Sequence, residues 1–303
     1  MTLDPGATTF TELTDEIVGN LLGYVRDHEI ATHLTSALNS TDVQMNLYDT
    51  SRTPGTGVIE IDDELLWAQE VDRSNNTLQV APYGRGYQGS TAAAHSQNAR
   101  VTFAPRFPRF RVKRAINQTI ASIGDQVPAV GTTTFEYDAM VTTYSMPATA
   151  EQGLEVVWQS IGPSERWIPV QRYQVNQNAN TTAWPTGRSI DIADRITPGQ
   201  TVQVTYIKNP TLLSAGSDVF TATGFPASLY DVVVWGTMAR LVAPVESGRL
   251  DFKSVEADQL DNPTQFGSAQ NLSKYFNQLF LMRLQEERQK FYERYQPRIR
   301  RAI

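Results

Sequence analysis

The spacing of apolar residues switches repeatedly between a helical and a strand period, and this switching constrains the fold more than any other feature of the chain. Over residues 10–25 apolar side chains recur at intervals of three and four, which predicts an amphipathic helix over about 10–27. From about residue 41 they alternate with polar side chains, as in half-buried strands. Helical spacing returns after Pro105 and again after Pro226, on either side of a second strand-like stretch.

The simplest architecture with this pattern is an α+β fold in which two β modules are inserted into a helical body. We expect the discontinuous helical body over residues 1–40, 104–127 and 213–303. A small β module is expected over residues 41–103. Residues 128–212 should form a larger β-sandwich-like insertion, because their turn motifs recur at the spacing of a sandwich.

Composition excludes several classes of protein. The chain has no cysteine, which rules out disulfides, thiol catalysis and cysteine metal sites and fits folding in a reducing cytoplasm. No apolar run exceeds four residues (Val232–Trp235 is one), against the roughly 20 that a transmembrane helix needs. The amino terminus also lacks the basic and apolar regions of a signal peptide. We therefore expect no membrane association.

The net charge of −6 conceals a strongly polarised chain. Residues 1–70 contain 13 acidic and 2 basic residues, a net charge of −11, whereas residues 71–124 contain 1 acidic and 8 basic residues, a net charge of +7. Such a chain could stack acidic surfaces on basic ones between identical subunits or between different rings. The alternative is solvated charge that clusters only in sequence.

The segment Gly84–Gly89 matches the glycine pattern of dinucleotide-binding loops. That chemistry also needs a parallel strand before the loop, a helix after it, and an acidic residue about 20 positions later. The segment that follows has little helical potential and leads into a stretch rich in Pro and Arg. A glycine-rich β turn is the better interpretation.

No other motif predicts a metal site or a catalytic site. His28 and His33 lie five positions apart, which places them on different helix faces and indicates surface histidines. The run Asp62-Asp63-Glu64 could attract a cation, but a polar turn or an exposed edge is favoured. The third histidine, His95, gives acid–base catalysis little to draw on. We expect no enzyme activity, no cofactor and no bound metal.

A dense basic cluster follows the small β module, at Arg106, Arg109, Arg111, Lys113 and Arg114. One interpretation is contact with DNA phosphates or with an acidic protein surface, such as a neighbouring subunit. The other is a face neutralised within the chain by the acidic amino-terminal helix. The sequence leaves both open.

Four aromatic residues of the insertion could form a sugar-binding face or could belong to a sandwich core, which is the commoner arrangement. They are Trp158, Trp167, Tyr173 and Trp184.

Several segments resemble the head-to-tail connector (adaptor) proteins of long-tailed bacteriophages, especially those of actinobacterial hosts. They are Phe10–Leu13, Leu22–Asp27, Gly57–Trp67 and Phe225–Arg249. The segment Ala81–His95 is similar to a module shared among phage virion proteins, in which an Arg-Gly…Gly-Ser/Thr…Ala-Ala-His pattern closes a small β domain. The resemblance covers about residues 1–125 and 225–300 and omits the insertion.

The resemblance implies a helical, adaptor-like body and a structural role in the virion neck. A ring, commonly of twelve subunits, would lie between the portal protein and the next neck or tail protein, around the DNA channel, after assembly in the host cytoplasm. The basic carboxyl-terminal arm after Pro297 would dock on the portal, through Arg298, Ile299, Arg300, Arg301 and Ile303. The main alternative is a structural protein of the tail tip or fibre that binds the host. A cell-wall glycosidase is a weaker third possibility, because no acid/base pair is recognisable.

Overall fold

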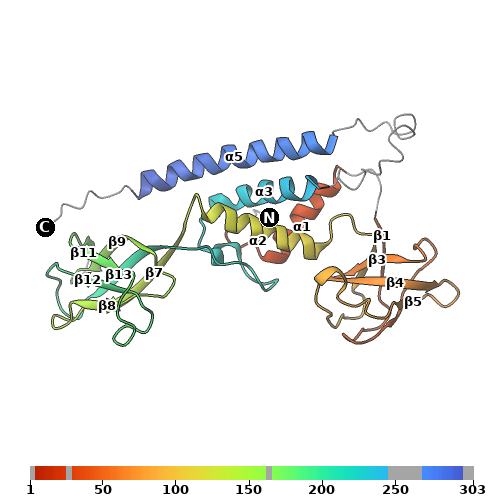
Figure 1. Cartoon of the computed structure of the whole chain (residues 1–303), viewed down its shortest axis with the longest axis horizontal. Helices are drawn as coiled ribbons and strands as arrows, with labels where there is room; N and C mark the ends of the chain where they lie inside the picture. The colour runs from red at the N-terminus through yellow and green to blue at the C-terminus, as the bar shows by residue number, and fades with distance from the viewer. Residues whose placement is uncertain (1–3, 25–28, 162–165, 245–267, 296–303) are drawn as a thin grey trace. The chain divides into compact units, whose positions relative to one another are not determined.

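A computed structural model describes residues 4–24, 29–161, 166–244 and 268–295. The chain divides into two compact units. The first contains residues 1–9, 119–233 and 279–303, and the second contains residues 10–118 and 234–278. The helices of the described residues are α1 (Phe10–Leu22), α2 (Arg109–Gly124), α3 (Tyr230–Val242) and α5 (Ser268–Arg294) (Figure 1).

The second unit contains a six-stranded antiparallel sheet with the strand order β1-β6-β3-β4-β5-β2. Alternate residues of its strands enter one core, which includes Leu34, Met45, Ile59, Leu66 and Val101. The strands are β1 (Ile30–His33), β2 (Gln44–Asn46), β3 (Gly57–Ile61), β4 (Glu64–Asp72), β5 (Thr77–Val80) and β6 (Arg100–Phe103).

The first unit contains two further antiparallel sheets that share one hydrophobic core. The larger has the order β10-β9-β13-β7 and the smaller β11-β12-β8. Val156, Ile190 and Val204 lie in the shared core. The strands are β7 (Ala129–Glu136), β8 (Thr143–Ser145), β9 (Gln152–Gln159), β10 (Trp167–Pro169), β11 (Tyr173–Asn176), β12 (Ser189–Ile192) and β13 (Thr201–Lys208).

The helices form where their periodicity predicts them. In α1 the residues at helical spacing, Phe10, Leu13, Ile17 and Leu21, are buried. α3 is buried almost all round, as its nearly continuous apolar sequence predicts. By contrast, α5 buries few of its side chains, among them Phe276, whose ring lies 5.9 Å from that of Trp235.

The expected helical, adaptor-like body is wrong. Thirteen strands in antiparallel sheets dominate the described residues, which contain four α-helices. Two regions that were expected to be helical also contain a strand or extended backbone. Residues 30–33 form β1, which pairs with β6, and residues 213–229 contain extended backbone and two short 3-10 helices, η2 (Phe220–Thr223) and η3 (Ala227–Leu229). The expected domain boundaries stay a prediction.

Candidate functional site

The carboxylate of Glu64 is the most heavily hydrogen-bonded group of the small β module. Glu64 begins β4, and its side chain is 1% exposed. Arg85 donates to it from Nε and Nη2, both at 2.8 Å. The backbone N–H groups of Gly86 and Ala93 donate at 2.9 and 3.0 Å, and Nε2 of His95 lies 2.9 Å away. Several donors thus converge on one buried carboxylate, which is the condition for keeping it charged inside a protein.

Arg85 extends this cluster to the loops around the sheet. Its Nη1 donates to the carbonyl oxygens of Asn39 and Asp42, both at 2.7 Å. Its Nη2 also donates to the carbonyl oxygen of Ala93 at 2.6 Å. A planar guanidinium group presents its donors in a fixed geometry, so one side chain can hold several segments in register. We call Glu64, Arg85 and His95 the buried charge cluster.

His95 is held in its charged form between two carboxylates. Its Nδ1 lies 2.7 Å from Asp62, and its side chain is 1% exposed. Burial alone would lower the pKa of His95, but the hydrogen bonds to Asp62 and Glu64 outweigh it and raise that pKa to about 9. Burial would raise the pKa of Glu64, but its bonds to Arg85 and His95 outweigh that effect and lower it to about 2. Glu64 and His95 are therefore both charged at neutral pH.

The glycine-rich segment serves this cluster, and the predicted turn is confirmed. The N–H of Gly84 donates to the carbonyl oxygen of Ala81 at 2.8 Å, which closes a tight turn after β5. Gly86 adopts a φ of 61° and directs its N–H to Glu64. The segment continues into a 3-10 helix of three residues, η1 (Tyr87–Gly89), and the sheet around it is antiparallel. It therefore lacks the parallel strand and the helix start on which a dinucleotide phosphate would rest.

The run Asp62-Asp63-Glu64 divides between two roles. Asp62 and Asp63 form the exposed turn between β3 and β4, as predicted, whereas Glu64 is buried, which was not predicted. His33 is exposed on β1, and His28 lies outside the described residues. In the described part of the chain, no cluster of His, Asp and Glu has the arrangement of a metal site.

Two members of the basic cluster are neutralised within the chain. The Arg109 guanidinium pairs with Asp15 of α1, and its Nε lies 3.5 Å from Asp63. Lys113 Nζ lies 2.5 Å from Asp63 and 5.1 Å from the centre of the Phe10 ring. Arg109 thus pairs with the amino-terminal helix, as the intrachain interpretation expects, whereas the carboxylate partner of Lys113 is Asp63 in the turn between β3 and β4.

The other members of the basic cluster face solvent. Arg106, Arg111 and Arg114 are exposed. The N–H of Arg106 donates to Glu29 at 3.0 Å, and the guanidinium of Arg111 contacts the amide oxygen of Gln88. Among the described residues, no carboxylate pairs with the side chains of Arg111 and Arg114, which lie one turn apart on α2. We call Arg111 and Arg114 the exposed arginine pair.

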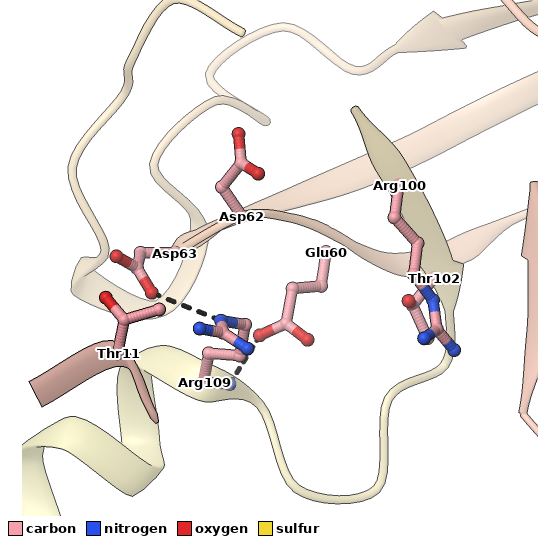
Figure 2. A pocket seen from close by; sticks show the side chains of 7 residues that line it. All are labelled: Thr11, Glu60, Asp62, Asp63, Arg100, Thr102 and Arg109. Atoms are coloured by element: carbon pink, nitrogen blue, oxygen red, sulfur yellow. Dashed lines mark hydrogen bonds and ion pairs between the residues drawn. The ribbon is translucent and has the colours of Figure 1, made fainter. Parts of the chain in front are cut away.

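A polar pocket of about 400 Å³ lies beside the start of α2. Glu60 is 7% exposed, and its Oε1 accepts the N–H of Arg109, the first residue of α2, at 2.5 Å. Burial raises the pKa of Glu60 to about 7, although the bond from Arg109 opposes this shift. Figure 2 shows the lining side chains: Thr11, Glu60, Asp62, Asp63, Arg100, Thr102 and Arg109. Glu60 thus caps the helix, and its carboxyl keeps its proton to a higher pH than an exposed glutamate does.

The aromatic residues of the insertion do not form one surface. Trp158 and Tyr173 are partly buried and pack against the shared core, as core residues do. Trp184 is half-buried, and Trp167 is 46% exposed on β10. The carboxyl-terminal arm with Arg298, Ile299, Arg300, Arg301 and Ile303 lies outside the described residues.

A comparison with protein-family models and with curated proteins finds no match to this chain. No helix of the described residues is both long enough and apolar enough to cross a membrane.

Replacing Glu64 by glutamine should lower the free energy of unfolding by about 3–5 kcal/mol, because Arg85 would keep a buried positive charge without its carboxylate and His95 would retain only Asp62. Urea unfolding at pH 7 measures this change. Glu70→Gln is the matched control, since Glu70 is exposed on the same strand. Its effect should stay within about 0.5 kcal/mol. Equal stability of the two variants would show that the cluster does not hold the module together.

Replacing His95 by glutamine should remove a pH dependence. The pKa of His95 is raised from 6.5 to about 9, so its protonation stabilises the fold fully below pH 6.5 and loses that effect as the pH rises through 9. The stability difference between the wild type and His95→Gln should therefore shrink between pH 6.5 and 9.5, as followed by urea unfolding. His33→Gln, at an exposed position of β1, should leave the pH profile unchanged. A constant difference across this range would contradict the assignment.

Replacing Glu60 by glutamine should stabilise the protein in mildly alkaline solution. The folded state keeps a proton on Glu60 that the unfolded state releases between pH 4.5 and 7, so the stability that Glu60 contributes falls as the pH rises through this range. Glutamine can still accept the N–H of Arg109 and carries no charge. Glu60→Gln should gain up to about 3 kcal/mol over the wild type at pH 8 and nothing at pH 4.5. Thermal unfolding at both pH values measures this, and a gain of equal size at both would refute it.

Proposed function

We propose that the chain is a non-catalytic structural subunit of the neck of a long-tailed bacteriophage. It forms a ring around the DNA channel, between the portal protein and the next neck or tail protein. The subunit is rich in β structure. Neighbouring subunits of the ring make heterologous contacts, as a closed cyclic ring requires. Its location in the particle would be the virion neck.

The observation that carries the proposal is that the segments resembling phage virion proteins form the buried charge cluster. The segments Gly57–Trp67 and Ala81–His95 supply every member of the buried charge cluster. Both ring nitrogens of His95 are bonded to carboxylates, those of Asp62 and Glu64. These charged side chains therefore hold the module together, which favours a structural role over catalysis.

The exposed arginine pair supports a contact with a negatively charged partner. Arg111 and Arg114 are not neutralised by described carboxylates, whereas Arg109 and Lys113 are. Partners with the required charge are the phosphates of DNA in the channel and the acidic surface of a neighbouring subunit. The basic arm at residues 298–303 remains a second proposed contact, with the portal.

A second candidate is a structural protein of the tail tip or fibre that binds the host through the insertion. The observation in its favour is a set of exposed apolar side chains on and near β10. Trp167 is 46% exposed, Ile161 70% and Ile168 38%. Negative-stain imaging of the purified chain with the portal protein of the same phage separates the two candidates. A neck subunit gives closed rings that bind the portal, and a host-binding protein binds cells or their polysaccharide instead.

Reversing the charge of the exposed arginine pair should impair ring assembly without unfolding the subunit. Arg111→Glu with Arg114→Glu should change the free energy of unfolding by about 0.5 kcal/mol or less per site, because both side chains are exposed. Arg109→Glu is the comparison variant, since it sets a new carboxylate against Asp15, Asp63 and Glu60 and should destabilise the fold. Thermal unfolding and imaging of the rings give the two readouts. Rings of wild-type yield from the double variant would reject this role for the pair.

A further inference from the structure

β7 is an unprotected edge strand. It lies at one end of the order β10-β9-β13-β7, and β13 is its one partner strand among the described residues. The opposite edge, β10, has three residues and ends in Pro169, which lacks the donor that a further strand would need. β7 has eight residues, contains no proline and carries no charge before Glu136. Natural proteins usually guard a long edge strand, so an open one indicates a pairing surface.

The hydrogen bonds at the ends of β7 show which of its residues face outward. The N–H of Tyr137 donates to the carbonyl oxygen of Gln200 at 2.9 Å, on the β13 side. Because backbone groups alternate along an antiparallel strand, the odd-numbered residues bond to β13 and the even-numbered residues face away from it. Val130 agrees, since its N–H donates away from β13, to the carbonyl oxygen of Gly224 at 3.0 Å.

The remaining outward positions are open. Thr132, Thr134 and Glu136 are exposed, and no described residue pairs with their outward backbone groups. Three successive outward residues therefore present N–H and C=O groups to solvent, in the arrangement that β-strand addition uses. An added strand must match this short stretch, because Gly224 already occupies the position at Val130.

We propose that β7 pairs in antiparallel orientation with β7 of a second copy of this chain, with Thr134 opposite the partner's Thr134. This register places Thr132 opposite the partner's Glu136, and Glu136 opposite the partner's Thr132. Each of the three pairs exchanges two backbone hydrogen bonds, so every open outward group is satisfied on both copies.

Alternative registers satisfy fewer groups. A centre at Thr132 or Thr133 brings the second strand against Val130, whose N–H is already bonded to Gly224. A centre at Glu136 sets two carboxylates directly opposite each other, which is unfavourable. The register centred on Thr134 avoids both and places threonine opposite threonine, a favourable cross-strand pair. The edge is therefore complementary to itself.

This contact has two-fold symmetry and differs from the heterologous contacts of a closed ring. It rests on the geometry of the insertion and does not depend on the proposed function. If the chain forms no ring, the β7 contact can still form. If the β7 contact does not form, the chain can still form a ring.

The test uses the absence of cysteine from the chain. Thr134→Cys and Thr132→Cys each introduce one thiol on the same strand, at exposed positions of the same residue type. Opposed residues of a hydrogen-bonded antiparallel pair have Cα atoms about 5.5 Å apart, within the range of about 4.4–6.8 Å for a disulfide. Under mild oxidation, Thr134→Cys should give on the order of tenfold more disulfide-linked dimer than Thr132→Cys, whose opposed residue is the partner's Glu136.

Two further measurements complete the test. A mixture of Thr132→Cys and Glu136→Cys should cross-link to each other in preference to themselves. Sedimentation of the cysteine-free chain should show a concentration-dependent dimer that Thr134→Pro abolishes, since that change removes an outward N–H and none of the bonds to β13. Thermal unfolding of the reduced cysteine variants confirms that each is folded. Equal cross-linking at positions 132 and 134, or a monomer at every concentration, would overturn the proposal.

Discussion

The carboxylate of Glu64 is buried together with the charged side chains of Arg85 and His95, and the small β module is organised around it. Removing an ion from water costs several kcal/mol even after the protein relaxes, so such a group persists only when donors surround it. Here they come from the Arg85 guanidinium, the His95 ring and two backbone N–H groups. Because all these donors lie between Arg85 and His95, in the connection from β5 to β6, satisfying one carboxylate fixes the path of that segment.

The acidic and basic parts of the sequence partly neutralise each other within one unit of the fold. The acidic first part of the chain supplies Asp15, Glu60 and Asp63, and the basic second part supplies Arg109 and Lys113. Their ion pairs and the helix cap at Glu60 lie together at the start of α2. Part of the apparent excess of each sign is thus neutralised inside the subunit. The exposed arginine pair is the part of the basic cluster for which the described residues supply no carboxylate.

Periodicity predicted the helices and the two strand-rich regions, and it failed where few side chains carry the signal. β1 buries one of its four residues, so its sequence shows no alternation, and β6 is equally short. The helical body was expected from the helical spacing of the apolar residues, and the resemblance gave it an adaptor-like form; the antiparallel sheets contradict it. The role of Glu64 could not be predicted, because Arg85 and His95 lie 21 and 31 residues away along the chain. In the sequence, Glu64 cannot be distinguished from the exposed turn residues Asp62 and Asp63 until its partners are known.

The central position of β13 has a consequence for how the insertion is made in the cell. β13 lies between β7 and β9 and pairs with both, although it is the last strand of the insertion in sequence. Ala129 pairs with Lys208, so the larger sheet closes across the whole length of the insertion. Long-range pairing of this kind is slow, because the ends of a long loop must meet before any contact offsets the loss of entropy. During synthesis, β7 and β9 therefore leave the ribosome before the strand that joins them, and the sheet can form only after residue 208 has emerged.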